Sequence, residues 1–189
     1  MYIELGQIEC LNLISVNVGK CADITQDSLV DFCHHQAQSL QELNIDWCRR
    51  VMVDNPEKIL RLFGYLAKIR LFSMKGISAH KGMRDCFQQI DENLTDLDIS
   101  CCDVPSQQMF EGLNANKGIV KTLKNLKMSS FSFHSDDFVR LAPNLANLVS
   151  IELRSCHDGV TDQTLQVTVS EKIKKSHIKN NQSLHRCWW

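Results

Sequence analysis

Cysteine and histidine are the residues of this 189-residue chain with the widest chemical repertoire, and the chain has nine cysteines and seven histidines. Thiolate and imidazole groups bind zinc, and an activated thiolate is a nucleophile. The two densest groups of these residues are Cys33-His34-His35 and Cys101-Cys102. The sequence has no C-x-x-C pair and no second pair at zinc-finger spacing, however. We therefore predict no metal site.

Motifs for catalysis are also absent from the sequence. It contains no Ser-His-Asp order, no nucleophile elbow, no phosphate-binding loop and no His-Glu-x-x-His helix. We predict that the chain is not an enzyme and that it binds no cofactor.

The charge composition gives no reason to expect a polyanionic partner. The chain has 21 Lys and Arg against 22 Asp and Glu, a formal net charge of −1, so no overall field attracts nucleic acid or a membrane. Residues 1–10 carry two glutamates where a secretory signal needs a basic start and an apolar run, and no stretch has 18 apolar residues. We expect a cytoplasmic protein, with the nucleus as a second location, and reduced thiols.

An internal repeat organises most of the chain. The skeleton Leu-x-x-Leu-x-Leu-x-x-Cys aligns six times at steps of 25–29 residues, beginning at Leu13, Leu40, Leu66, Leu94, Leu123 and Leu148. Counted from that first residue, positions four and six are apolar, and position nine is cysteine in four of the six copies. A period of this length is typical of leucine-rich repeats. One unit cannot bury its apolar face alone, so neighbouring units must stack.

The segments between the predicted strands have the apolar spacing of helices. Apolar residues recur there at intervals of three and four, and Thr25, Ser135 and Thr161 are hydroxyl residues followed by acid, as expected of helix N-caps. We predict an α/β leucine-rich-repeat solenoid, a horseshoe arc with a parallel concave sheet and convex helices. The predicted divisions are 1–12 as an N-terminal partial repeat or edge, 13–166 as the repeat domain and 167–189 as a basic, disordered tail. We expect a monomer.

The repeats resemble the cysteine-containing leucine-rich repeats of the F-box/LRR family. The best matches are CADITQDSL at 21–29, SLQELNIDWC at 39–48 and IELRSCHDGVTDQTL at 151–165. This resemblance implies that the repeats recognise a protein substrate for SCF-type, ubiquitin-dependent degradation. In that family a separate F-box binds the Skp adaptor and, through it, the cullin complex.

The resemblance covers only the recognition half of such a protein. No segment before Leu13 is long enough for an F-box, and no Leu-Pro-x-Glu stretch occurs in the chain. Similar repeats also occur in proteins without an F-box, resembling the antagonist-of-mitotic-exit family. The alternative function is therefore an F-box-free scaffold or adaptor with no link to ubiquitin.

The alternation of a strand assigns side chains to the concave face. Positions three and five alternate in charge between neighbouring repeats, as Glu42, Lys68, Asp96 in one row and Arg70, Asp98, Lys127, Glu152 in the other. Opposite charges on adjacent strands attract by roughly 0.2–1 kcal/mol per pair, so part of this face neutralises itself. Trp47 at position eight and Phe72 at position seven are expected to lie side by side in solvent, and exposed aromatics are common anchors of interfaces.

We therefore predict a partner-binding surface made of Glu42, Asn44, Asp46, Trp47, Lys68, Arg70, Phe72 and Asp98. The alternative for Trp47 is that its ring folds over the neighbouring strand. The cysteines of position nine are expected to pack in the core, whereas Cys101, at the solvent-facing position eight, is the candidate for a reactive thiol.

Overall fold

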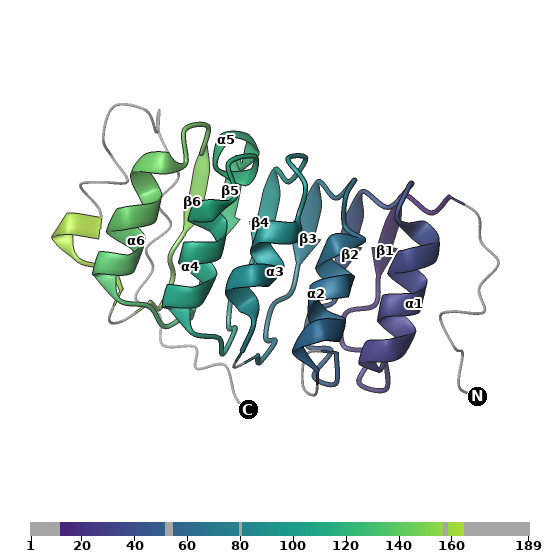
Figure 1. Ribbon diagram of the computed structural model, residues 1–189. Helices are drawn as coiled ribbons and strands as arrows, with labels where there is room; N and C mark the ends of the chain where they lie inside the picture. Colours follow the sequence, from purple (N-terminus) through teal and green to yellow (C-terminus); the bar gives the residue numbers. More distant parts are fainter. Residues whose placement is uncertain (1–11, 52–54, 80, 157–158, 165–189) are drawn as a thin grey trace.

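The computed structural model describes residues 12–51, 55–79, 81–156 and 159–164. Its strands form one open sheet in which neighbours along the chain are parallel neighbours in space (Figure 1). The strands are β1 (Ser15–Asn17), β2 (Glu42–Asn44), β3 (Leu71–Ser73), β4 (Asp96–Asp98), β5 (Asn125–Lys127) and β6 (Ser150–Glu152). The predicted α/β leucine-rich-repeat solenoid of six repeats is confirmed in strand order and direction.

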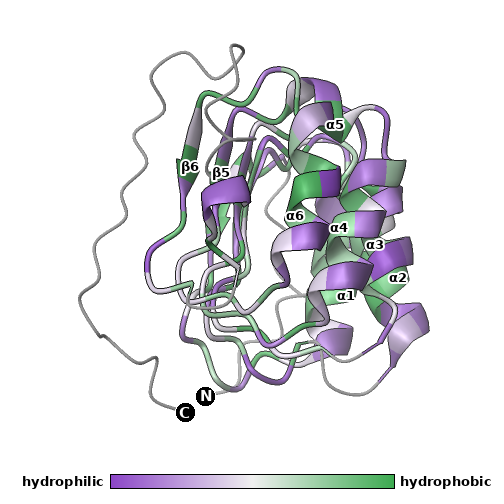
Figure 2. Ribbon diagram, turned by 90° about the vertical axis from the view of Figure 1, so that its left-hand side faces the viewer, coloured by the Kyte–Doolittle hydropathy of each residue, from purple (hydrophilic) through white to green (hydrophobic). Residues whose placement is uncertain are grey.

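The helices lie on one side of this sheet, and the other side is left uncovered by them (Figure 2). They are α1 (Gln26–Gln36), α2 (Pro56–Gly64), α3 (Met83–Gln89), α4 (Ser106–Ala115), α5 (Ile119–Thr122), α6 (Ser135–Leu141) and the 3-10 turn η2 (Ala142–Asn144). No helix in the described ranges is both long and apolar enough to cross a membrane. Of the predicted terminal segments, only residue 12 lies within the described residues.

Side-chain caps start several helices, as the sequence indicated. Thr25 accepts the backbone N–H of Ser28, whose hydroxyl reaches back to the Thr25 N–H, forming a capping box. Residues 162–164 are also helical, and Thr161 before them accepts the N–H of Thr164 at 3.2 Å. Ser135 was predicted to cap α6 but is its first helical residue, and His134 stands at the N-cap without a side-chain hydrogen bond.

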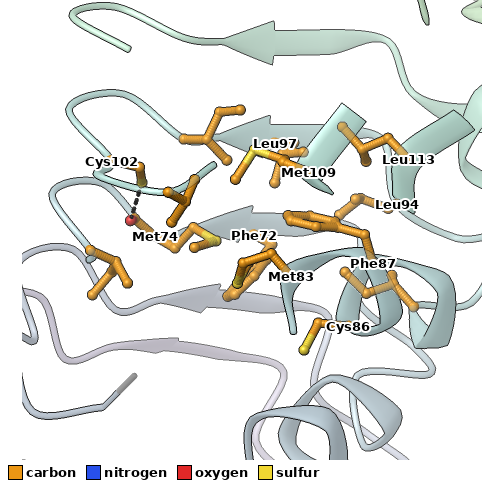
Figure 3. Close-up of a cluster of buried hydrophobic side chains, with 14 of the residues drawn as sticks. Phe72, Met74, Met83, Cys86, Phe87, Leu94, Leu97, Cys102, Met109 and Leu113 are labelled. Atoms are coloured by element: carbon orange, nitrogen blue, oxygen red, sulfur yellow. Dashed lines mark hydrogen bonds between the residues drawn. The ribbon is translucent and has the colours of Figure 1, made fainter. Parts of the chain in front are cut away.

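The core lies between the sheet and the helices. Positions four and six of each repeat point toward the helices, and Figure 3 shows Phe72, Met74 and Leu97 in one buried cluster with Met83 and Phe87 of α3. Phe72 and Met74 are fully buried. Because each repeat contributes one layer, the core is continuous along the array.

The sequence alignment of the third repeat is wrong by three residues. Phe72, and not Ile69, is the register partner of Leu43 in β2 and of Leu97 in β4. The third repeat therefore begins at Ile69 instead of Leu66, and Phe72 holds its position four.

Apolar burial explains this register. Leu66-x-x-Ile69-x-Leu71 fits the repeat skeleton by residue type, but it turns the larger Phe72 toward solvent. The observed register buries Phe72 completely and leaves Leu71 38% exposed, and burying the larger ring removes more apolar surface from water. It also brings Gly76 to position eight, where its φ is +67°, a conformation that glycine adopts without strain.

Candidate functional site

Three of the four cysteines at position nine of the repeats are buried and structural. These three donate an S–H hydrogen bond to the position-six carbonyl oxygen of the preceding repeat. The pairs are Cys48 to Val18 at 3.0 Å, Cys102 to Met74 at 3.0 Å and Cys156 to Met128 at 2.8 Å. Figure 3 shows the Cys102 bond. Each thiol thus donates a hydrogen bond to a buried backbone carbonyl oxygen, which has two lone pairs and can accept a second hydrogen bond.

Burial also suppresses the reactivity of these thiols. Desolvation raises the pKa of Cys102 from 9.0 to about 12 and that of Cys156 to about 11. The helix residues Cys33 and Cys86 are buried and their pKa values are also raised to about 12 by desolvation. Because the thiolate is the reactive form, these side chains are protonated and inert near neutral pH.

The remaining described cysteines differ from this set. Cys21, at position nine of the first repeat, is an exposed free thiol, so the expectation that it packs in the core is wrong. Cys101 is disulfide-bonded, so the expectation that all thiols are reduced is wrong there and its sulfur is not the predicted reactive thiol. Within the described ranges no three His, Cys, Asp or Glu side chains come together in a metal-binding group.

Position eight of every repeat has a left-handed backbone. The residues are Lys20, Trp47, Gly76, Cys101, Ser130 and Ser155, with φ between +54° and +67°. This conformation directs the position-eight N–H to the position-seven carbonyl of the next repeat, as from Trp47 to Lys75 at 2.7 Å. The turn therefore continues the ladder of backbone hydrogen bonds beyond the short strands.

Trp47 lies over the backbone of the next repeat. A methyl group placed on Gly76 would come within 2.1 Å of the Trp47 ring, so the ring occupies the space that a side chain there would fill. The alternative in which Trp47 folds over its neighbour is thus the observed one. The residue is half-buried, and its contact with a partner stays a prediction.

The open sheet face is the side of the sheet that faces away from the helices, formed by positions three, five and seven. Glu42 and Asn44 lie on it in β2, Asp98 lies on it in β4, and Asp46 follows β2 at position seven. These four predicted residues share one surface, on two strands that are two repeats apart.

The predicted residues of the third repeat do not join this surface as expected. Phe72 is buried in the core, because it holds position four. Arg70 and Lys68 are exposed but lie in the turn that precedes β3. The predicted charge alternation is therefore wrong at this repeat, where Leu71 and Ser73 occupy positions three and five.

A depression of about 280 Å³ lies at the centre of the open sheet face. Its lining comes from β2 to β5 and the turns after them: Asn44, Asp46, Leu71, Phe72, Ser73, Lys75, Asp96, Leu97, Asp98, Asn125 and Lys127. Four of the predicted residues belong to this lining: Asn44, Asp46, Asp98 and, in its floor, Phe72.

Asp46 is held at the depression by neutral donors. Its Oδ1 accepts the Ser73 hydroxyl at 2.6 Å and the Lys75 backbone N–H at 2.8 Å, and its Oδ2 accepts Asn44 Nδ2 at 3.2 Å. Asp46 makes no ion pair with any described residue. Its charge is oriented but not neutralised.

Asp96 has the same kind of environment. Thr95 Oγ1 donates to its Oδ2 at 2.7 Å and Asn125 Nδ2 donates to its Oδ1 at 2.6 Å. It too has no cationic partner among the described residues. This carboxylate is likewise fixed without a counter-charge.

Asp98 differs because it is paired. Lys75 Nζ lies 3.4 Å from its Oδ2, and the Ser100 backbone N–H donates to its Oδ1 at 3.0 Å. Asp98 and Lys127 are register partners on β4 and β5. Asp98 therefore lies between the two lysines of the depression, Lys75 and Lys127.

The predicted surface omitted several lining residues. Leu71, Ser73 and Lys75 were missed because the third repeat was out of register by three residues. Asp96 and Lys127 were recognised as members of the charged rows but not as site residues. Only the position of the depression distinguishes them from other polar residues of the same rows.

Comparison with known proteins gives structural neighbours of low similarity. No family model matches this sequence, and no curated protein matches it. One solved structure is the leucine-rich repeat-containing protein LegL7 from Legionella pneumophila, with a TM-score of 0.40 and 12% identity over 87% of this chain and 64% of that one. Another is the complex of Rad7 and Elc1 in yeast, with a TM-score of 0.35 and 13% identity over 91% of this chain and 69% of the matched chain. The chain thus spans less than two thirds of the length of the LegL7 chain.

Proposed function

We propose that this chain is a protein-binding module whose partner lies across the open sheet face. The observation that carries the proposal is the depression over β2 to β5, where charged side chains of four adjacent repeats surround one exposed leucine. Core packing explains the residue types at positions four, six and nine. It does not explain the charged side chains and the exposed leucine of the depression. The buried, protonated thiols support a binding role without catalysis by cysteine.

A site-specific crosslinking experiment tests this proposal. A photoreactive amino acid is introduced at Lys127 or Asn44, on the open sheet face, and for comparison at Asp31, which is exposed on α1 on the opposite side. We expect the same cellular protein to be crosslinked from both sheet-face positions and not from Asp31. Crosslinking from Asp31 alone would place the binding surface on the helices and overturn the proposal.

The finer function that we propose is substrate recognition in SCF-type, ubiquitin-dependent degradation. It is supported by the cysteine-containing repeats, which resemble those of F-box/LRR proteins. Its partners are a protein substrate on the open sheet face and, through an F-box, the Skp adaptor and cullin. The chain itself shows no Leu-Pro-x-Glu stretch, so the proposal requires an F-box encoded elsewhere in a longer form.

The alternative is an F-box-free scaffold or adaptor with the same binding surface and no link to ubiquitin. Co-precipitation of the Skp adaptor and cullin with the full-length gene product separates the two. Recovery of both supports the ubiquitin role. Recovery of the crosslinked partner without either of them favours the scaffold.

A further inference from the structure

We infer that the segment bound in the depression is an extended stretch of a partner protein that carries arginine or lysine next to an aliphatic residue. This inference rests on the proposed function and names the chemistry of its partner.

The charge of the open sheet face is negative overall. Positions three, five and seven of the six repeats carry five carboxylates and three cations, a net charge of −2. The carboxylates are Glu42, Asp46, Asp96, Asp98 and Glu152, and the cations are Lys75, Lys127 and Arg154. Lys75 is paired with Asp98 and Arg154 with Glu152. A cationic partner therefore fits this face better than an anionic one.

The two unpaired carboxylates at the depression are preorganised for a cation. Asp46 and Asp96 are each fixed by at least two neutral donors, at distances of 2.6–3.2 Å. These donors hold the oxygen atoms in place without cancelling their charge. A bound guanidinium or ammonium group then forms charge-assisted hydrogen bonds without first having to order its acceptors.

Leu71 explains why an aliphatic residue belongs beside the cation. It occupies position three, in register with Glu42 on one side and Asp96 on the other, and its side chain is 38% exposed. An aliphatic side chain placed on Leu71 removes apolar surface of both molecules from water. The lysine and arginine stems extend such a contact along the same floor.

The openness of this face favours a segment over a small molecule. The depression spans four adjacent strands on a side of the sheet that the helices leave uncovered (Figure 2). An extended segment laid across the strands therefore fits it better than a drug-sized ligand, which binds where most of its surface is enclosed.

Selection from a peptide library tests the inference with the whole chain. The immobilised protein is panned at low salt against random dodecapeptides displayed on phage, and the enriched sequences are compared with the input library. We expect enrichment of arginine or lysine adjacent to leucine, isoleucine, valine or methionine. Enrichment of acidic or uncharged peptides, or no enrichment, overturns the inference.

Matched variants then test which carboxylates bind the enriched peptide. Asp46→Asn with Asp96→Asn removes two charges from the depression. Each asparagine keeps one of the two acceptor oxygens, and its NH2 group replaces the other. We expect this double variant to bind about tenfold more weakly than the wild type at low salt, and to lose most of the salt dependence. The control is Asp31→Asn with Glu92→Gln, which removes the same charge from exposed residues of α1 and of the turn after α3.

The outcomes separate this inference from the proposed function. Equal weakening by the control pair attributes the effect to overall charge and overturns the inference. If the open sheet face crosslinks to a partner but the selected peptides lack basic residues, the proposed binding function is supported and the basic segment is rejected. Circular dichroism of both variants verifies that each is folded before binding is compared.

Discussion

Replacing Phe72 with alanine removes the largest side chain at position four of the array. The Phe72 ring is fully buried and meets the Phe63 ring edge to face, with centroids 5.5 Å apart and an interplanar angle of 88°. The helix α2 and the neighbouring strands enclose the site, so its wall collapses only partly when the ring is removed. The variant therefore loses both the burial of the ring and its contacts, and it leaves a cavity.

The expected cost of Phe72→Ala is about 3–5 kcal/mol, the range for large-to-small changes of a buried phenylalanine. The neighbouring Leu71 is 38% exposed and its removal opens onto solvent, so Leu71→Ala should cost about 1 kcal/mol. For a chain of this length each kcal/mol lowers the melting temperature by roughly 2–4 °C. Phe72→Ala should thus lower it by about 6–20 °C, well beyond the effect of Leu71→Ala.

Urea unfolding followed by circular dichroism measures both variants. Repeat arrays sometimes unfold in parts, so the m-value must match that of the wild type before midpoints are converted to free energies. In the alternative register read from the repeat skeleton, Leu71 is buried and Phe72 faces solvent. A Leu71→Ala cost equal to or larger than the Phe72→Ala cost would therefore refute the observed register.

Three further predictions concern helix packing and the free thiols. A methyl group on Gly112 would come within 2.5 Å of the Arg84 backbone oxygen, whereas one on Gly64 meets nothing within 4 Å; Gly112→Ala should lower the thermal midpoint, and Gly64→Ala should raise it by an amount equivalent to about 0.4–1 kcal/mol. Equal midpoints for these variants would contradict the close α3–α4 contact. At neutral pH, Cys21→Ser should remove one fast-reacting thiol from the native protein in an Ellman assay, and Cys102→Ala should remove none. Burial raises the pKa of Cys102 from 9.0 to about 12 in the folded protein, so its contribution to stability is present below pH 9 and is lost as the pH rises toward 12. The variant Cys102→Ala should therefore show a smaller fall in melting temperature between pH 8 and pH 10.5 than the wild type. An equal fall in both proteins would reject this linkage.

The repeat architecture could be predicted from residue types because each position has one dominant physical requirement. Leucine or isoleucine at positions four and six, as at Leu43 and Ile45, must leave water whichever partner stacks on it. The cysteine of position nine was recognised as a packing residue, correctly in three of the four repeats that have it. Its acceptor, the position-six carbonyl of the preceding repeat, became visible only when the repeats were stacked.

The candidate site could be predicted only in part. Glu42, Asn44, Asp46 and Asp98 were assigned to the correct face because strand alternation determines it once the register is known. Phe72 was assigned to the wrong face, since two overlapping apolar patterns in the third repeat fit the same skeleton. Local spacing does not distinguish them, whereas their burial against neighbouring repeats does.

The sequence by itself determined the period and, in five of the six repeats, the strand position and the inward face, because those follow from apolar spacing within single repeats. Only the tertiary structure decided the register of the third repeat, the position of Trp47 over Gly76 and the unpaired state of Asp46 and Asp96 among the described residues. These features depend on contacts between residues some 25–30 positions apart in the chain. Stacking brings such residues within a few ångströms of one another, and a pattern read along one repeat does not contain that information.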